Sequence, residues 1–316
     1  MKQLRPGFLP CVLGPTGAGK TAAALALAEA LPGPARVLNA DSRQVYRDLP
    51  LLTAQPPPED QARFPHLLYG FLPLTERLGA GEYARLAGAA VRETLEAGAL
   101  PILAGGTGLY VRALLSGLAP IPPVPADILQ DLQAECAALG SPALYALLRR
   151  EDPEYAARIH PRDPQRVVRA LAVLRATGIP FSRWHAVPAA PAPFRPVKVG
   201  VDLPPAELED RLRRRLEAML AAGALEEIRR ASALCPDPGA PGWTGIGCRE
   251  LLRHLAGEMD EAACRSLWLR NTRAYAKRQR TWFRRDREIV WFSPDETSAL
   301  VEYVLEKLTS SPLNCS

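Results

Sequence analysis

Residues 14–21 read GPTGAGKT, a stretch that fits the pattern G-x-x-x-x-G-K-[ST]. It follows the strand-like apolar segment Phe8–Leu13 and precedes the Ala- and Leu-rich helical segment Thr21–Leu31. In this context backbone N–H groups and a helix N-terminus bind phosphate, Lys20 adds a positive charge, and the Thr21 hydroxyl can hold Mg²⁺. The stretch predicts a diphosphate-binding loop made of Gly14, Pro15, Thr16, Gly17, Ala18, Gly19, Lys20 and Thr21.

Short apolar runs alternate with helical patterns around this loop, which is typical of a parallel sheet covered by helices. We therefore expect an α/β protein with a P-loop NTPase-like parallel sheet and helices on both faces. Further strands are predicted at Arg36–Ala40, Leu100–Ala104, Val197–Leu203 and Ile289–Phe292, and further helices at Gly81–Ala97 and Pro205–Ala222.

Proline-rich stretches open and close a segment whose own patterns are helical. We therefore expect a catalytic core of residues 1–117 and 196–316, with an inserted, all-helical subdomain of residues 118–195.

The composition limits the class of protein. With 316 residues, of which 47% are hydrophobic, the chain can bury a full core. No apolar run approaches the roughly 20 residues that a membrane-spanning helix needs, and the N-terminus lacks the long apolar region of a signal peptide. The six cysteines show no metal-binding spacing. We expect a cytoplasmic protein with reduced, structural cysteines.

The loop alone does not distinguish a nucleotide from another diphosphate. An ATP-hydrolysing enzyme of this class holds Mg²⁺ with an Asp that follows an apolar strand. The strand Leu100–Ala104 is followed instead by Gly105 and Gly106, and Asp202 follows a run that contains a glycine. The ATPase interpretation is therefore incomplete.

Asp41 is predicted to follow the second strand, at the carboxyl edge of the sheet where α/β proteins bind ligands. It could equally cap a following helix. The stretch GGTGLY at 105–110 could be a binding turn or only a tight strand-to-helix turn. Together with the phosphate loop, the two segments favour a functional site.

A helical pattern near the C-terminus separates basic from aromatic residues. At 100° per residue, one stripe contains Arg270, Arg273, Lys277, Arg280 and Arg284, and the opposite side contains Trp268, Tyr275 and Trp282. We expect the aromatic side to pack inward and the basic side to follow RNA phosphates, with plain solvation as the alternative.

Seven motifs occur in the order found in the tRNA dimethylallyltransferases, so the chain resembles that family over nearly its whole length. They are GPTGAGKT at 14–21, ADSRQVY at 40–46, GGTGLY at 105–110, HPRDPQRVVRAL at 160–171, the helix with Arg211 and Arg215 that ends in MLAAG at 219–223, GIGCRE at 245–250 and TRAYAKRQRTWFRR at 272–285. Three departures concern Gln55 in place of Lys, Tyr69-Gly70 in place of a hydrophobic residue and Asp, and Cys248 in place of Tyr.

The resemblance implies transfer of a dimethylallyl group from dimethylallyl diphosphate to N6 of the adenosine next to the anticodon of tRNA. It implies that Asp41 is the general base, Thr107 contacts the adenosine and Arg211 contacts the diphosphate, with Mg²⁺ as cofactor at Thr21. The insertion would clasp the anticodon arm, and the enzyme would act as a monomer without a membrane or an obligate protein partner. The implied tRNA-facing residues are Asp41, Ser42, Arg43, Gln44, Thr107, Gln165, Arg166, Val167, Val168, Arg169, Gly245, Ile246, Gly247, Cys248 and Arg249, to which the basic stripe adds Arg273, Lys277 and Arg280.

Three alternatives use the same loop. A P-loop small-molecule kinase and a prenyltransferase acting on free adenine nucleotides are both disfavoured by the basic helix and the insertion. A non-catalytic RNA-binding protein would be favoured by the loss of Lys20 or Thr21, but both are present.

Overall fold

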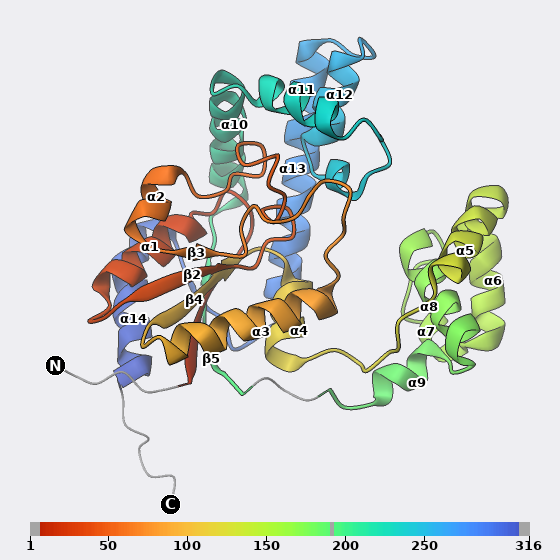
Figure 1. The fold of residues 1–316 in the computed structure, drawn as a ribbon, viewed down its shortest axis with the longest axis horizontal. Coiled ribbons are helices and arrows are strands. Elements are labelled where there is room, and N and C mark those ends of the chain that lie inside the picture. Colours follow the sequence, from red (N-terminus) through yellow and green to blue (C-terminus); the bar gives the residue numbers. More distant parts are fainter. Residues whose placement is uncertain (1–6, 190–192, 310–316) are drawn as a thin grey trace, which may run out of the picture. The chain divides into compact units, whose positions relative to one another are not determined.

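The computed structural model describes residues 7–189 and 193–309 of the chain. Six strands form one parallel sheet in the order β3-β2-β4-β1-β5-β6 (Figure 1), which confirms the predicted α/β class. Their bounds are β1 (Phe8–Leu13), β2 (Ala35–Asn39), β3 (His66–Leu67), β4 (Leu100–Gly105), β5 (Arg195–Val201) and β6 (Val290–Phe292). The strand β3 was not predicted, because two residues are too short to show an alternating pattern.

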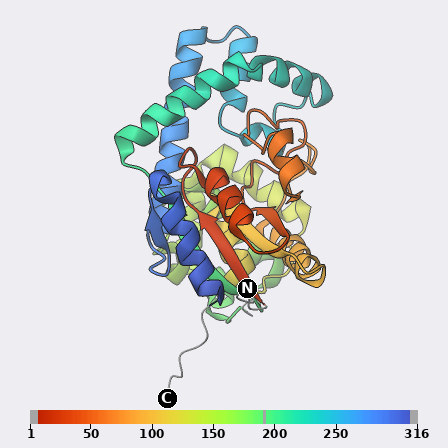
Figure 2. The same cartoon turned by 90° about the vertical axis from the view of Figure 1, so that its left-hand side faces the viewer.

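Both faces of the sheet are buried, which explains why its strands are almost continuously apolar. Successive residues of β1 point to opposite faces: Val12 packs with α1 (Lys20–Ala30) and α14 (Thr297–Thr309), whereas Cys11 and Leu13 belong to the core on the other face. Figure 2 shows α14 beside α1. The other face is covered by α3 (Ala80–Glu96) and α4 (Gly108–Ser116).

A group of helices continues this unit beyond the carboxyl ends of the strands (Figure 1). Its longest member, α13, extends from this group back to the sheet, and α10 packs against it through Leu208, Leu212 and Ala276. The group contains α10 (Pro205–Ala221), α11 (Ala224–Leu234), α12 (Cys248–Leu255) and α13 (Glu261–Phe283), with a 3₁₀ turn η1 (Pro241–Thr244) before α12. Two short elements lie outside the group: α2 (Pro58–Arg63) precedes β3, and the 3₁₀ turn η2 (Pro294–Glu296) precedes α14.

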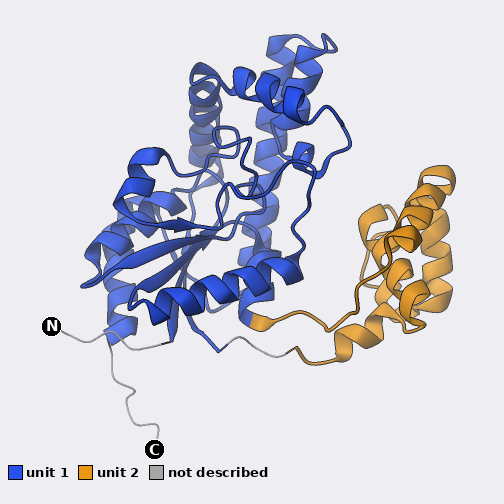
Figure 3. Cartoon of the chain, viewed as in Figure 1, with its two compact units in different colours: residues 1–115, 192–316 blue, residues 116–191 orange. Residues whose placement is uncertain are grey.

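The chain divides into two compact units, residues 1–115 with 192–316 and residues 116–191 (Figure 3). The predicted insertion, 118–195, starts two residues later and ends four residues later than the second unit. That unit is helical throughout its regular structure and packs around the buried residues of α8. Its helices are α5 (Ala126–Leu139), α6 (Ser141–Glu151), α7 (Pro153–Ala156), α8 (Pro164–Thr177) and α9 (Phe181–Ala186).

Within the described ranges, no helix is both long and apolar enough to cross a membrane. The five described cysteines are free thiols; four are buried and Cys136 is half-buried. Cys315 lies outside the described residues.

Candidate active site

The phosphate loop leads from β1 into α1, as the motif predicts. Gly14, Gly17 and Gly19 adopt positive φ angles of 143°, 80° and 102°. A Cβ atom at Gly14 would collide with the carbonyl oxygen of Val201, so a larger residue would push the loop away from β5. The Lys20 ammonium donates a hydrogen bond of 2.7 Å to the Pro15 carbonyl, which holds the charge over the loop.

A cavity of about 610 Å³ opens over this loop. Four cations line it: Lys20 and, on α10, Arg211, Arg214 and Arg215. Asp41 is the one carboxylate among the lining residues. This excess of positive charge next to helix N-terminal N–H groups suits a polyanion such as a diphosphate. Thr21, in the first turn of α1, lines the same cavity with its side chain exposed.

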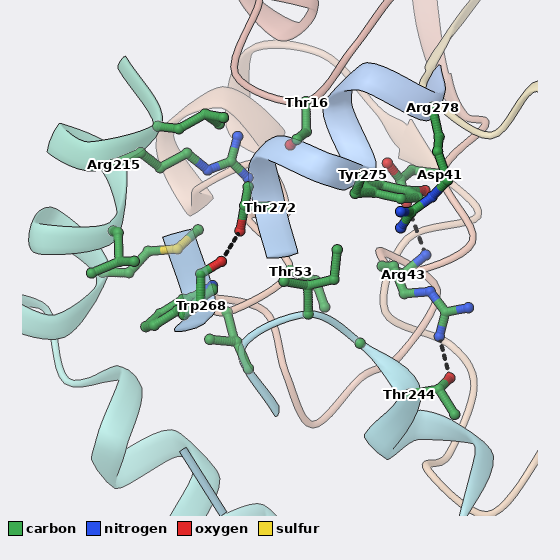
Figure 4. Close-up of a pocket in the computed structure, with 16 residues that line it drawn as sticks. Thr16, Asp41, Arg43, Thr53, Arg215, Thr244, Trp268, Thr272, Tyr275 and Arg278 are labelled. Carbon is green, nitrogen blue, oxygen red and sulfur yellow. Dashed lines mark hydrogen bonds between the residues drawn. The ribbon is translucent and has the colours of Figure 1, made fainter. Parts of the chain in front are cut away.

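A second cavity of about 290 Å³ adjoins the first, since Thr16, Asp41, Thr53 and Arg215 line both. Figure 4 shows how its lining side chains converge from the phosphate loop, the segment after β2, α10, α13 and the turn before α12. Its other lining residues include the apolar Leu52, Leu212, Leu216, Met219, Ile246 and Trp268 and the polar Arg43, Thr244, Thr272, Tyr275 and Arg278. A cationic cavity and one with a mixed apolar and polar lining therefore adjoin at the Asp41 carboxylate.

Asp41 is held by hydrogen bonds from both sides. Its backbone N–H donates to the side-chain oxygen of the buried Asn39 (2.7 Å), and the amide nitrogen of Asn39 donates to the Asp41 carbonyl (3.0 Å). The Asp41 carboxylate accepts a bond of 2.9 Å from the Arg43 N–H. No helix follows directly, so the alternative that Asp41 caps a helix is wrong: it caps a turn that points it into both cavities.

Thr107 lies next to this segment but lines neither cavity. Its hydroxyl accepts a hydrogen bond of 2.9 Å from the Ser42 N–H and donates one of 3.3 Å to the Ser42 hydroxyl, and Tyr275 is a further partner. Burial and the nearby Asp41 raise the pKa of Tyr275 to about 12. Thr107 therefore supports Ser42 next to Asp41, and its contact with the adenosine stays a prediction.

Burial lowers the pKa of Lys20 to about 8; Asp41 opposes this shift and Arg215 adds to it. The free protein thus loses the Lys20 charge as pH rises through about 8, and its affinity for a diphosphate substrate falls with it. The value of kcat/KM for that substrate reports the pKa values of the free protein, so we expect it to fall above about pH 8. Lys20→Arg should remove this limb, since arginine stays charged. A wild-type profile that stays flat to pH 9.5 would contradict the shift.

Asp202, the alternative Mg²⁺ ligand, is buried and ion-paired. Its carboxylate accepts bonds from Arg280 (2.7 and 3.1 Å) and from Arg284 (3.1 Å), and Arg280 also donates to the Leu203 carbonyl. Two guanidinium groups thus neutralise the carboxylate and fasten α13 to the end of β5. This pairing argues against the ATPase interpretation.

The same pairing involves part of the predicted basic stripe. Arg280 and Arg284 pair with Asp202, and Arg273 pairs with Glu209 at 3.0 Å, so these three cations are already ion-paired. The side chains of Arg273 and Arg284 are nevertheless 53% and 52% exposed, as expected for an outward face, whereas Arg280 is 25% exposed. Contact of this face with RNA stays a prediction. Among the residues that the structure describes, Arg270 and Lys277 form no ion pair. The aromatic side is also divided, because Trp268 is buried as predicted whereas Trp282 is 37% exposed.

We expect Asp202→Asn to lower the free energy of unfolding by about 1–3 kcal/mol, less than for a fully buried pair because both arginines are partly exposed. Urea unfolding measures this, with Asp295→Asn as an exposed control. The Mg²⁺ concentration for half-maximal activity should not change. A large rise in that concentration would restore Asp202 as a metal ligand.

Several predicted tRNA-facing side chains are buried. Val167 and Val168 belong to the core of the second unit, whereas Gln165, Arg166 and Arg169 are exposed on the same helix. The predictions for Val167 and Val168 are wrong, because a run of five residues on a helix cannot all face outward.

In the loop before α12, Gly247 and Cys248 are buried, and a Cβ atom at Gly247 would collide with Trp268. The Cys248 side chain is a core residue, 1% exposed, and burial raises the pKa of its thiol to about 12. Gly245 and Ile246 line the smaller cavity, and Arg249 is exposed.

The sequence reasoning missed several residues of the site. Arg215 lines both cavities, and its presence beside Arg211 in the quoted motif was the available signal. Tyr69, one of the departures, lines the larger cavity, while Gln55 is structural because it donates to the Tyr46 carbonyl (2.7 Å). Gln279 gave no local signal, since its partner Thr16 lies 263 residues away. Asn39 was missed although it holds the backbone of Asp41, two residues further along the chain.

Over residues 44–286 the sequence matches the family described as IPP transferase. The chain belongs to this family. It is similar to a tRNA dimethylallyltransferase of Oleidesulfovibrio alaskensis, with 51% identity over 93% of this chain and 96% of the relative. A tRNA dimethylallyltransferase of Nitratidesulfovibrio vulgaris is 55% identical over 92% of this chain and 93% of the relative.

Solved structures agree with the family assignment. The tRNA isopentenylpyrophosphate transferase of Bacillus halodurans is 31% identical, with a TM-score of 0.69 over 96% of this chain and 97% of that protein. A eukaryotic dimethylallyltransferase acting on tRNA shares the fold, with a TM-score of 0.81 at 24% identity over 97% of this chain and 80% of that protein. Both units of the chain therefore have counterparts in members of the family.

Proposed function

We propose that this enzyme transfers a dimethylallyl group from dimethylallyl diphosphate to N6 of the adenosine next to the anticodon in tRNA. The observation that carries this proposal is the junction of the two cavities: a cationic pocket over the phosphate loop adjoins, at Asp41, a pocket lined by both apolar and polar side chains. The diphosphate suits the first, and the prenyl group and the adenine suit the second. The curated relatives are named for this activity.

The reaction breaks the bond between the prenyl carbon and the diphosphate oxygen and forms a bond between that carbon and N6. Negative charge develops on the leaving diphosphate, where Lys20, Arg211 and Arg215 line the cavity together with the loop N–H groups. Charges that are already in place stabilise the transition state without reorganisation. These residues therefore assist departure of the diphosphate.

Adenine N6 is a weak nucleophile because its lone pair is delocalised into the ring, so loss of its proton must accompany attack. Asp41 is the single carboxylate that lines either cavity. Its backbone and one carboxylate oxygen are fixed by Asn39 and by the Arg43 N–H. We assign to Asp41 the role of the base that accepts the N6 proton.

Mg²⁺ fits this site as a partner of the bound diphosphate. No group of three or more His, Cys, Asp or Glu in the described ranges could hold a metal ion by itself. Mg²⁺ commonly uses one protein oxygen and substrate phosphates, and the exposed Thr21 hydroxyl at the start of α1 offers such an oxygen. When bound there, the ion would neutralise charge on the diphosphate.

We assign contacts to tRNA to residues of both units that line a cavity or are exposed. In the first unit, Arg43 and the segment Gly245–Ile246 line the smaller cavity, Gln44 lines the larger one, and Lys277 is free of carboxylates among the described residues. In the second unit the candidates are Gln165, Arg166 and Arg169. We further propose that the enzyme acts as a monomer, since one unit of a single chain lines both cavities, and that it is cytoplasmic, as the sequence predicts.

The test is mass-spectrometric nucleoside analysis of unmodified tRNA incubated with the enzyme, Mg²⁺ and dimethylallyl diphosphate. We expect N6-dimethylallyladenosine, located next to the anticodon by sequencing. Parallel reactions contain ATP alone, or AMP in place of tRNA. Consumption of ATP without a prenylated product would favour a small-molecule kinase, and prenylation of AMP but not of tRNA would favour a nucleotide prenyltransferase.

A further inference from the structure

The buried side chain of Gln279 joins two loops that are far apart in the sequence. Gln279 lies on α13 and is only 4% exposed. Its side-chain oxygen accepts a hydrogen bond of 2.8 Å from the Thr16 N–H in the phosphate loop. Its amide nitrogen donates one of 2.9 Å to the Gly106 carbonyl, directly before Thr107. One amide therefore connects the donor-binding loop to the turn that supports Ser42.

The Gln279 amide is packed closely against the turn after β4. A Cβ atom at Gly106 would collide with the Gln279 amide nitrogen and would lie 3.2 Å from the Gly14 carbonyl oxygen. The phosphate loop, the turn after β4 and α13 thus meet at one point. This explains why the position before Thr107 is a glycine, although the φ angle of Gly106 is not positive.

Glutamine is suited to this position by its chemistry. Its side chain offers an acceptor and a donor at the same distance from the backbone, whereas glutamate only accepts, lysine only donates and methionine does neither strongly. Both partners are backbone groups at a buried point, where an unpaired N–H or C=O costs about 1–3 kcal/mol. Loss of the amide would let both loops move to find other partners.

We propose that Gln279 is a positioning residue that fixes the donor loop relative to the acceptor side of the site. Thr16 lines both cavities, and the turn that contains Gly106 supports Ser42 next to Asp41. The reacting atoms in such a transfer must be held about 3–3.5 Å apart, and a displacement of about 1 Å can cost roughly 10²-fold in rate. The inference rests on the proposed function, because its main readout is prenyl transfer.

The test is steady-state kinetics of Gln279→Met, which keeps the length of the side chain but removes both hydrogen bonds. We expect kcat to fall by about 10- to 100-fold and KM for dimethylallyl diphosphate to rise. Thr281→Ala, an exposed change two residues further along α13, is the baseline control. Asn271→Leu removes another side-chain anchor of α13, the bond of 2.6 Å to Glu250, and should leave the donor KM unchanged.

Two further measurements separate positioning from stability. In Gln279→Met, hydrogen–deuterium exchange should become faster in peptides that cover residues 14–17 and 105–107, because the Thr16 N–H loses its partner. Gly106→Ala should reproduce the kinetic defect while keeping Gln279. Gln279→Ala removes the side chain with which a Cβ atom at position 106 would collide. The loss of activity in the double variant Gly106→Ala/Gln279→Ala, expressed as a free energy, should therefore be smaller than the sum of the losses in the two single variants.

A folded Gln279→Met enzyme with wild-type kcat, donor KM and loop exchange would overturn the inference. A lower melting temperature with unchanged KM and loop exchange would also overturn it, since it would indicate a purely structural role. If the wild-type enzyme transfers no prenyl group while loop exchange responds as expected, the proposed function fails and the positioning of the two loops stands.

Discussion

Asp41→Asn should lower kcat for prenyl transfer by about 10²- to 10⁴-fold, the range for loss of a well-placed general base. The asparagine oxygen can still accept the hydrogen bond from the Arg43 N–H, and Asn39 still holds the backbone. The turn should therefore keep its shape, and the affinities for donor and tRNA should change little. Single-turnover kinetics with saturating donor would isolate the chemical step.

The matched control is Asp48→Asn, in the same loop after β2, because Asp48 lines neither cavity. It should keep wild-type turnover. If Asp41→Asn loses less than tenfold in the single-turnover rate, the N6 proton goes to another acceptor. Equal losses in the two variants would instead point to a general disturbance of the loop.

Lys20→Met should lower kcat/KM for dimethylallyl diphosphate by about 10²- to 10³-fold, as is usual for loss of one preorganised donor to a developing oxyanion. Methionine has a similar length but no charge and no N–H. The loss should be large because burial makes the interior around Lys20 poorly polarisable, as its lowered pKa indicates. Both donor binding and turnover should suffer, since the diphosphate is charged before and after the bond breaks.

Lys307→Met provides the control, because Lys307 lies in the last turn of α14 and lines neither cavity of the site. Its kinetic constants should match the wild type. Addition of excess Mg²⁺ should not rescue Lys20→Met if the lysine charge acts directly on the diphosphate. Wild-type kcat/KM in Lys20→Met would remove Lys20 from the diphosphate site.

Much of the fold was predictable because local patterns encode burial. The strand Phe8–Leu13 was predicted with its observed bounds, and the helix Pro205–Ala221 differs from its prediction by one residue. The helix contains a regular apolar period that reports which side faces the core, and the strand is a short apolar run that ends at the glycine-rich loop. The two-residue strand β3 has no such period, and it forms only because β2 lies beside it.

The site was predictable where chemistry is carried by contiguous residues. The phosphate loop and Asp41 lie on segments whose position at the sheet edge follows from topology alone. Arg280 and Val167 show the limit of this reasoning. A helical wheel placed Arg280 on a basic face but does not reveal that this face meets Asp202. Val167 belonged to a contiguous stretch taken from the family resemblance, which does not say which of its side chains enter the core of the second unit.

The sequence by itself determined a parallel α/β protein with a diphosphate-binding loop and, through seven ordered motifs, its family. Only the tertiary structure decided which cations are free, which acid is neutralised and how the two loops are held together. Asp202 and Gln279 depend on partners 78 and 263 residues away. Such pairs leave no periodic trace in the chain, because they are set by the packing of whole elements against one another.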